Sequence, residues 1–173
     1  VAVAEQAAQG QVCAAANDNG GGQVVVSGDK AAVERALDIA KAKGAKRAML
    51  LPVSAPFHCA LMQPAADAMA DALAGVSIRP PTSPLVSNVL AAPIVDPEEI
   101  RRRLIEQVTG TVRWRESVAY MASHGVTRFF EIGAGKVLSG LVKRIADGAV
   151  GISVGGPNDI ASAKEALAAA QTA

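Results

Sequence analysis

The 173-residue chain has few aromatic residues, and its charges nearly balance. Aromatic residues make up 3% of the sequence, and the formal net charge is +1. Because nucleic-acid surfaces need a basic field or a set of stacking rings, this composition argues against a nucleic-acid partner. No apolar run approaches the roughly 18 residues of a membrane span, and the N-terminus lacks the layout of a signal peptide. The sequence therefore predicts a cytoplasmic protein.

Cysteine and histidine are also scarce, with two residues of each. Cys13 and Cys59 fit reduced, buried thiols better than a disulfide framework. The two histidines lie far apart in the sequence, and no His and Cys spacing matches a metal site, so we expect no bound metal. The hydrophobic content of 50% is nevertheless enough for a real core, which predicts one globular domain or two small lobes.

The first third of the chain carries signals for two helices and three strands. Helices are predicted at residues 1–9 and from Asp29, as the cap, to Gly44, and strands at 11–16, 23–27 and 45–51. The Asn- and Gly-rich loop 17–22 has no helix directly after it, so a hairpin turn explains it better than a phosphate loop. This order of elements is the ferredoxin-like pattern without its first strand. Because the chain also opens inside a helical pattern, we expect a fragment of a longer protein.

Downstream of residue 53, predicted strands and helices alternate. Helices are predicted after His58 with Pro64 in the first turn, from the capping Asp96, from Trp114 to Gly125, and at 137–145 and 159–171. Strands are predicted at 84–90, 126–132 and 149–154. Alternation of this kind predicts a parallel sheet covered by helices. We therefore expect an α/β fold with two incomplete lobes, at 1–52 and 53–173, and a solvated face at Arg101–Arg103.

His58 is the strongest candidate for chemistry on sequence grounds. It follows an apolar run and a turn stiffened by Pro52 and Pro56, and it stands just before a helical pattern. Loops held by a rigid scaffold are common places for catalytic groups, and histidine is the usual general base near neutral pH. Without further information, a satisfied packing or surface histidine is the competing interpretation.

Several motifs in this order resemble one enzyme family. Residues 53–62, 106–108, 112–114 and 131–138, read as VSAPFHCALM, EQV, VRW and EIGAGKVL, are similar to segments of malonyl-CoA:acyl carrier protein transacylases. The resemblance runs over essentially the whole chain and includes the segments 17–19 and 23–28. It implies an α/β-hydrolase-like core carrying a ferredoxin-like small subdomain, which agrees with the two predicted lobes.

The resemblance also implies roles for individual residues. The family's catalytic histidine corresponds to His58, and the glutamine that orients it corresponds to Gln107. We expect the backbone carbonyl of Gln107, rather than its side chain, to accept the second ring N–H, since the last carbonyls of a helix lack intrahelical partners. The implied substrate-binding residues are Phe57, Asn17, Asn88, Gly133 and Gly135. Phe57 would narrow the acyl pocket, and the glycines would form a turn facing the cleft or the phosphopantetheine arm.

The chain departs from the family because three of its features are not found in these residues. They are the Gly-His-Ser-Leu-Gly turn that carries the nucleophile, the Gly- and Gln-rich oxyanion loop, and the arginine that binds the malonyl carboxylate. The local match to G-x-S-x-G around Ser153 lies inside a strand pattern, so a small residue in a strand explains it better than a nucleophile. Cys59 adjoins its would-be base His58 in sequence, and a buried thiol is the better interpretation.

The sequence therefore predicts a malonyl-transferring acyltransferase of fatty acid biosynthesis that needs no metal or redox cofactor. Its expected partners are malonyl-CoA, an acyl carrier protein and the N-terminal remainder of the same enzyme. Basic residues that could dock an acidic carrier protein are Lys136, Lys143, Arg144, Arg113 and Arg115, although solvated helix faces explain each one singly. Two alternatives stay open: a polyketide-type acyltransferase domain, and a non-catalytic fragment that binds a carrier protein.

Overall fold

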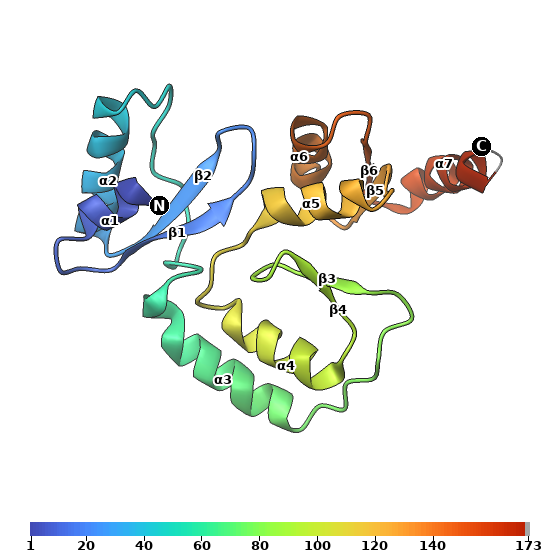
Figure 1. The fold of residues 1–173 in the computed structure, drawn as a ribbon, viewed down its shortest axis with the longest axis horizontal. Coiled ribbons are helices and arrows are strands. Elements are labelled where there is room, and N and C mark those ends of the chain that lie inside the picture. Colours follow the sequence, from blue (N-terminus) through green and yellow to red (C-terminus); the bar gives the residue numbers. More distant parts are fainter. Residues whose placement is uncertain (172–173) are drawn as a thin grey trace. The chain divides into compact units, whose positions relative to one another are not determined.

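The structure is a computed structural model that describes residues 1–171. It divides into two compact units, with the division between Ser117 and Val118 (Figure 1). Each unit contains α-helices and β-strands, so the chain has an α/β fold, as predicted. The strands of the described residues form three two-stranded sheets, β1–β2, β3–β4 and β5–β6. No helix in this part of the chain is long and apolar enough to cross a membrane.

The first unit begins with a hairpin flanked by two helices. Its elements are α1 (Ala2–Ala8), β1 (Cys13–Asp18), β2 (Val24–Gly28) and α2 (Lys30–Ala42). The strands pair antiparallel, which confirms the predicted hairpin. Both helices bury alanines, Ala4 and Ala7 of α1 and Ala32 and Ala36 of α2, and small side chains of this kind let the two helices pack closely.

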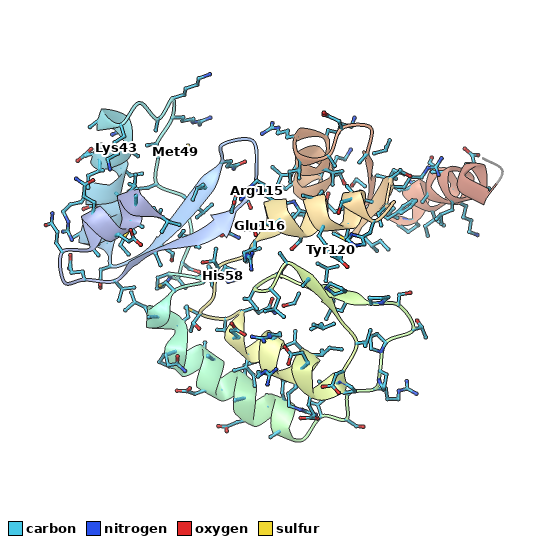
Figure 2. All side chains as sticks on the ribbon, viewed as in Figure 1. Lys43, Met49, His58, Arg115, Glu116 and Tyr120 are labelled. Carbon is cyan, nitrogen blue, oxygen red and sulfur yellow. The ribbon has the colours of Figure 1, made fainter. Side chains whose placement is uncertain are left out.

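One local prediction in this region is partly right and another is wrong: Asp29 holds the N-cap position of α2, and residues 45–51 were predicted to form a strand. Asp29 precedes α2, but its side chain makes no capping bond there. Its carboxylate accepts instead from the N–H of Val12 at 2.8 Å. Residues 45–51 form no strand, and Met49, Leu50 and Leu51 are each about half exposed (Figure 2 labels Met49). A strand exists only when a neighbour completes its ladder, and no strand of the described residues pairs with this segment.

The remainder of the first unit is a helix pair beside a short hairpin. Its elements are η1 (Ala60–Met62), α3 (Gln63–Ala74), β3 (Leu85–Ser87), β4 (Ala92–Ile94) and α4 (Pro97–Glu106). The Asp96 carboxylate accepts from the N–H of Glu99 at 2.8 Å, which confirms the predicted cap of α4. The strand predicted at 84–90 is shorter, and it pairs antiparallel with β4 rather than in a parallel sheet.

The prediction of a solvated arginine face on α4 is only partly right. The side chain of Arg101 donates to the backbone carbonyls of Leu73 and Val76, where it caps the C-terminus of α3. Arg102 is exposed and pairs with Glu99, as a solvated face requires. The arginine run therefore fixes α4 against α3 as well as facing solvent.

In the second unit, the parallel pair β5–β6 is covered by α6. Its elements are α5 (Trp114–Ser123, which begins in the first unit), β5 (Arg128–Ile132), α6 (Val137–Ile145), β6 (Val150–Val154), η2 (Pro157–Asp159) and α7 (Ile160–Gln171). The parallel pairing and α6 were both predicted. Glu131 at the end of β5 accepts hydrogen bonds from the N–H groups of Leu138 and Ser139 and from the Ser139 hydroxyl. These hydrogen bonds hold the pKa of Glu131 below its usual range, and the bond from the Ser139 hydroxyl contributes most.

Candidate active site

His58 lies in a turn just before η1 (Figure 2 labels it). Its φ of 60° places it in the left-handed region, which histidine enters more often than most residues. Cys59 beside it is buried, and its thiol donates to the carbonyl of Pro56 at 3.1 Å. The Ser27 hydroxyl of β2 lies 3.9 Å from the same sulfur. The turn that carries the His58 imidazole is therefore held in place by the buried thiol of Cys59.

The imidazole of His58 contacts the end of α4. Its Nδ1 lies 2.8 Å from the backbone oxygen of Gln107, 49 residues further along the chain. A carbonyl oxygen can only accept, so Nδ1 carries the proton in this contact. In the neutral ring, Nε2 is then the unprotonated nitrogen, which is the form that a general base needs.

The Gln107 carbonyl is available because α4 ends at this residue. The N–H of Gln107 still bonds to the carbonyl of Arg103, while the N–H of Gly110 turns back to the carbonyl of Glu106 at 2.9 Å. The carbonyl of Gln107 faces His58 instead of a later turn of helix. The acceptor is the backbone oxygen, as expected, and the catalytic roles of the two residues stay predictions.

The side chain of Gln107 has a different partner. Its Oε1 accepts from the amide Nδ2 of Asn88 at 3.1 Å. Both side chains line a cavity of about 170 Å³ between the β3–β4 hairpin and α4. The sequence suggested a substrate-binding role for Asn88, and no local pattern indicated its contact with a residue 19 positions away.

The segment that follows Gln107 is bound to the first hairpin. The Thr111 hydroxyl donates to the Ala15 carbonyl at 2.6 Å, and Val112 bridges Asn17 in a parallel arrangement. Arg115 then pairs with Asp18 at the end of β1, with 2.8 Å between nitrogen and carboxylate oxygen. These contacts connect the segment carrying the candidate acceptor to β1. The substrate-binding role suggested for Asn17 stays a prediction.

The Asp18–Arg115 pair predicts an acid-dependent loss of stability. The hydrogen bond from Arg115 is the main reason that the pKa of Asp18 lies below its usual range of about 4. A carboxyl whose pKa is lowered by folding stabilises the fold above its unfolded pKa, and that stabilisation is lost as the pH falls through the folded value. We expect Arg115→Ala to lower the unfolding temperature clearly at pH 6 and much less at pH 2.5, measured by circular dichroism.

Lys30→Ala supplies the control for this comparison. Lys30 and Glu34 are 4.0 Å apart and largely exposed, so their loss should change the unfolding temperature little at either pH. An equal effect of Arg115→Ala at pH 6 and pH 2.5 would contradict the prediction.

The other implied substrate residues lie in the His58 turn and in the second unit. Phe57 precedes it in the turn and is 48% exposed. Gly133 and Gly135 belong to the second unit, where the N–H of Gly133 donates to the Val154 carbonyl and the Gly135 carbonyl accepts from Ser153. The roles of all three residues in substrate binding stay predictions.

The alternative nucleophiles have structural roles. Ser153 lies in β6, and its hydroxyl is used in the hydrogen bond to Gly135 at 2.9 Å. Cys59 is the buried anchor described above, and burial raises the pKa of the Cys13 thiol, which disfavours its reactive thiolate. The Ser153 hydroxyl is already engaged, Cys59 is buried and the Cys13 thiolate is disfavoured, so none of the three groups is activated as a nucleophile.

Two of the five basic residues suggested for docking are engaged inside the first unit. Arg113 pairs with Glu116, and Arg115 pairs with Asp18 and approaches Glu116 (Figure 2 labels Arg115 and Glu116). An arginine already paired with a carboxylate contributes less to a new acidic partner. The docking interpretation is correspondingly weaker for Arg113 and Arg115.

The site resembles those of enzymes that pair a nucleophile with a general base, in the way that the base is held. It has a histidine on a stiff turn, a single tautomer fixed by a backbone acceptor, and an α/β scaffold that carries the turn.

No protein-family model matches the chain. It is 48% identical over 161 residues to the malonyl CoA-acyl carrier protein transacylase of Escherichia coli K12, covering 93% of this chain and 52% of the relative. For the Bacillus subtilis transacylase the identity is 43% over 159 residues.

Solved structures give the same result. The acyl-carrier-protein-S-malonyltransferase of Bartonella henselae superposes with a TM-score of 0.91 at 51% identity, covering 96% of this chain and 53% of that one. A malonyl-transacylase solved in complex with its type II PKS acyl-carrier protein superposes with a TM-score of 0.90 at 44% identity and similar coverage. The chain is therefore similar to one part of malonyl CoA-acyl carrier protein transacylases. It spans about half the length of the curated relatives it matches, namely their C-terminal half.

Proposed function

We propose that this chain is the base-bearing half of a transacylase that moves a malonyl group from CoA to the phosphopantetheine thiol of an acyl carrier protein. His58 serves as the general base and general acid, and the backbone carbonyl of Gln107 orients it. The nucleophilic serine comes from a segment of the complete enzyme outside these 173 residues. The observation that carries the proposal is the 2.8 Å contact between His58 Nδ1 and the Gln107 carbonyl.

The proposed reaction consists of two acyl transfers. In the first, Nε2 of His58 takes the serine proton while the serine oxygen attacks the malonyl thioester, and the imidazolium then protonates the departing CoA thiolate. In the second, the same nitrogen takes the proton of the carrier thiol, whose sulfur attacks the acyl-serine ester. The serine oxygen leaves and recovers the proton. No electron transfer and no metal is involved in either step.

A neutral acceptor distinguishes this site from those in which an aspartate orients the histidine. A carbonyl fixes the ring and its tautomer, but it stabilises the imidazolium less than a carboxylate does. The Gln107 carbonyl therefore gives the charged ring weaker electrostatic support than a carboxylate would. The acceptor's main contribution is therefore geometric.

The activities for which the relatives are named support the assignment of substrates and partner. The curated relatives are named as malonyl CoA-acyl carrier protein transacylases, and one structural neighbour was solved with an acyl-carrier protein. The substrate-binding roles of Phe57, Asn17, Gly133 and Gly135 belong to the same proposal. For Asn88, substrate binding is the alternative to a positioning role. Phe57 would disfavour branched acyl groups, with one methyl giving about 1 to 3 kcal/mol of discrimination. The complete enzyme would work in the cytoplasm, in fatty acid biosynthesis.

The finer description of the fold is also part of the proposal. The flanked hairpin β1–β2 supports a ferredoxin-like small subdomain over residues 1–52. The parallel pair β5–β6 with its covering helix supports an α/β-hydrolase-like core over 53–173. In the complete enzyme, the exposed apolar segment at 49–51 would find the strand partner that a ladder requires.

Complementation tests the proposed function. The chain would be produced together with the part of the E. coli relative that the match leaves out, and transfer of labelled malonyl from CoA to holo carrier protein would be measured. We expect transfer by the two polypeptides together and by neither alone. Binding of the carrier protein by a stable pair without any transfer would overturn the enzymatic proposal and favour the non-catalytic binding module.

A further inference from the structure

Asn88 contacts both ends of the segment that carries the Gln107 carbonyl. Its side-chain amide donates to Gln107 Oε1 at 3.1 Å, where the segment begins. Its backbone carbonyl accepts from the N–H of Arg113 at 2.9 Å, where the segment ends. The orienting carbonyl thus lies in a short loop, residues 107–113, whose two ends are bound to one residue of the β3–β4 turn.

The turn itself is held in place by Arg113. The guanidinium Nη1 donates to the carbonyls of Val89 at 3.3 Å and Leu90 at 3.0 Å. The same side chain is oriented by Glu116, to which its Nε donates at 3.1 Å. This pairing gives Arg113 a structural use and fixes the position from which Asn88 reaches Gln107.

Close packing holds the backbone of the loop, but not the side chain of Gln107. A Cβ added at Gly110 would lie 2.9 Å from Val89 Cγ1, so the loop packs against the turn too closely for a side chain at residue 110 unless Val89 shifts. The Gln107 side chain, by contrast, borders the 170 Å³ cavity described above. Where packing leaves room, a hydrogen bond has to provide the orientation.

We infer that Asn88 is a positioning residue for acyl transfer: through Gln107 it fixes the carbonyl that holds the tautomer of His58. The inference rests on the proposed function for its kinetic consequence, and it assigns Asn88 a role other than substrate contact. A misplaced acceptor would let the imidazole rotate or change tautomer, which lowers the rate of chemistry without weakening substrate binding.

Kinetics of the complemented enzyme separate the two roles of Asn88. We expect Asn88→Ala to lower kcat about tenfold and to change KM less than about twofold. In a Gln107→Ala background, which keeps the backbone carbonyl, the same change should have less than about a twofold effect, because its target has gone. A raised KM with unchanged kcat, or a full tenfold loss in both backgrounds, would overturn the inference.

Imidazole nitrogen NMR of the 173-residue chain tests the inference without any turnover. The chain has two histidines, so His124→Gln assigns the signals of His58. We expect one Nδ1–H tautomer for the wild type, and a mixture of tautomers with at least about tenfold faster Nδ1–H exchange for Asn88→Ala. Gln63→Ala removes an amide-to-carboxylate bond of 2.8 Å on α3 and should leave both signals unchanged.

The two measurements fail independently. An unchanged His58 spectrum in Asn88→Ala overturns the positioning role even if malonyl transfer is observed. A changed spectrum without any transfer by the complemented wild type supports the positioning role while the proposed function fails.

Discussion

His58→Ala is expected to lower malonyl transfer by the complemented enzyme at least about 10³-fold. Alanine removes the imidazole whose Nδ1 contacts the Gln107 carbonyl, so the serine keeps its proton and stays a weak nucleophile. The loss should appear mainly in kcat, because the imidazole accepts and donates a proton in the chemical step and does not bind the substrate. Transfer of labelled malonyl under saturating malonyl-CoA measures it directly.

His124→Ala is the matched control for this experiment. His124 is the other histidine of the chain, at the end of α5, where its Nδ1 lies 2.8 Å from the carbonyl of Tyr120 (Figure 2 labels Tyr120). It has the same kind of backbone partner but stacks on the Tyr120 ring, with 4.1 Å between ring centroids. We expect its replacement to change transfer less than about twofold. A His58→Ala enzyme that kept a tenth of the activity would remove His58 from the mechanism.

Elements whose signals are local could be predicted from the sequence. The cap at Asp96 needs only its neighbours, and the observed bond to Glu99 is the one that the capping pattern indicates. The parallel pair β5–β6 around α6 was predicted for the same reason, because the alternation of strand and helix is written in consecutive residues. In each case, the information lies in one continuous stretch of the sequence.

Contacts between distant residues could not be predicted in this way. The apolar run at 45–51 suggested a strand, yet a strand depends on a partner that no local pattern supplies. Asp29 had the residue type of a helix cap, but the N–H of Val12 competes for its carboxylate. The first difference comes from a missing strand partner, and the second from a tertiary hydrogen bond that replaces the local capping bond.

The candidate site shows the same division. The turn at His58 has local causes in its prolines, whereas the pairing with Gln107 spans 49 residues and was expected only from the family resemblance. The Asn88–Gln107 contact was missed, because the resemblance indicates which residues lie near the site but not which hydrogen bonds they form with one another. The role inferred for this contact follows from the cavity beside Gln107 and from the two ends of the loop 107–113, which only the three-dimensional structure shows.

Gly28→Ala is expected to destabilise the first unit by more than about 4 kcal/mol, the largest structural effect that any single methyl should have here. Gly28 ends β2 with φ 156°, and a Cβ there would lie 2.0 Å from the carbonyl oxygen of Val12. That carbonyl accepts from the N–H of Asp29, whose carboxylate in turn accepts from the N–H of Val12. The backbone therefore cannot move aside without breaking two hydrogen bonds and the Cys13–Gly28 strand pair.

Urea unfolding of the 173-residue chain measures the effect, with Gly75→Ala as control. Gly75 ends α3 at φ −89°, and a Cβ there meets no atom within 4 Å, so its replacement should change stability by no more than about 0.5 kcal/mol. Equal urea midpoints for the two variants would show that the hairpin tolerates the methyl.

Gly28→Ala should also affect the His58 turn, because Ser27, next to Gly28, contacts the Cys59 thiol that holds this turn. Malonyl transfer should therefore be lower in any enzyme that still folds.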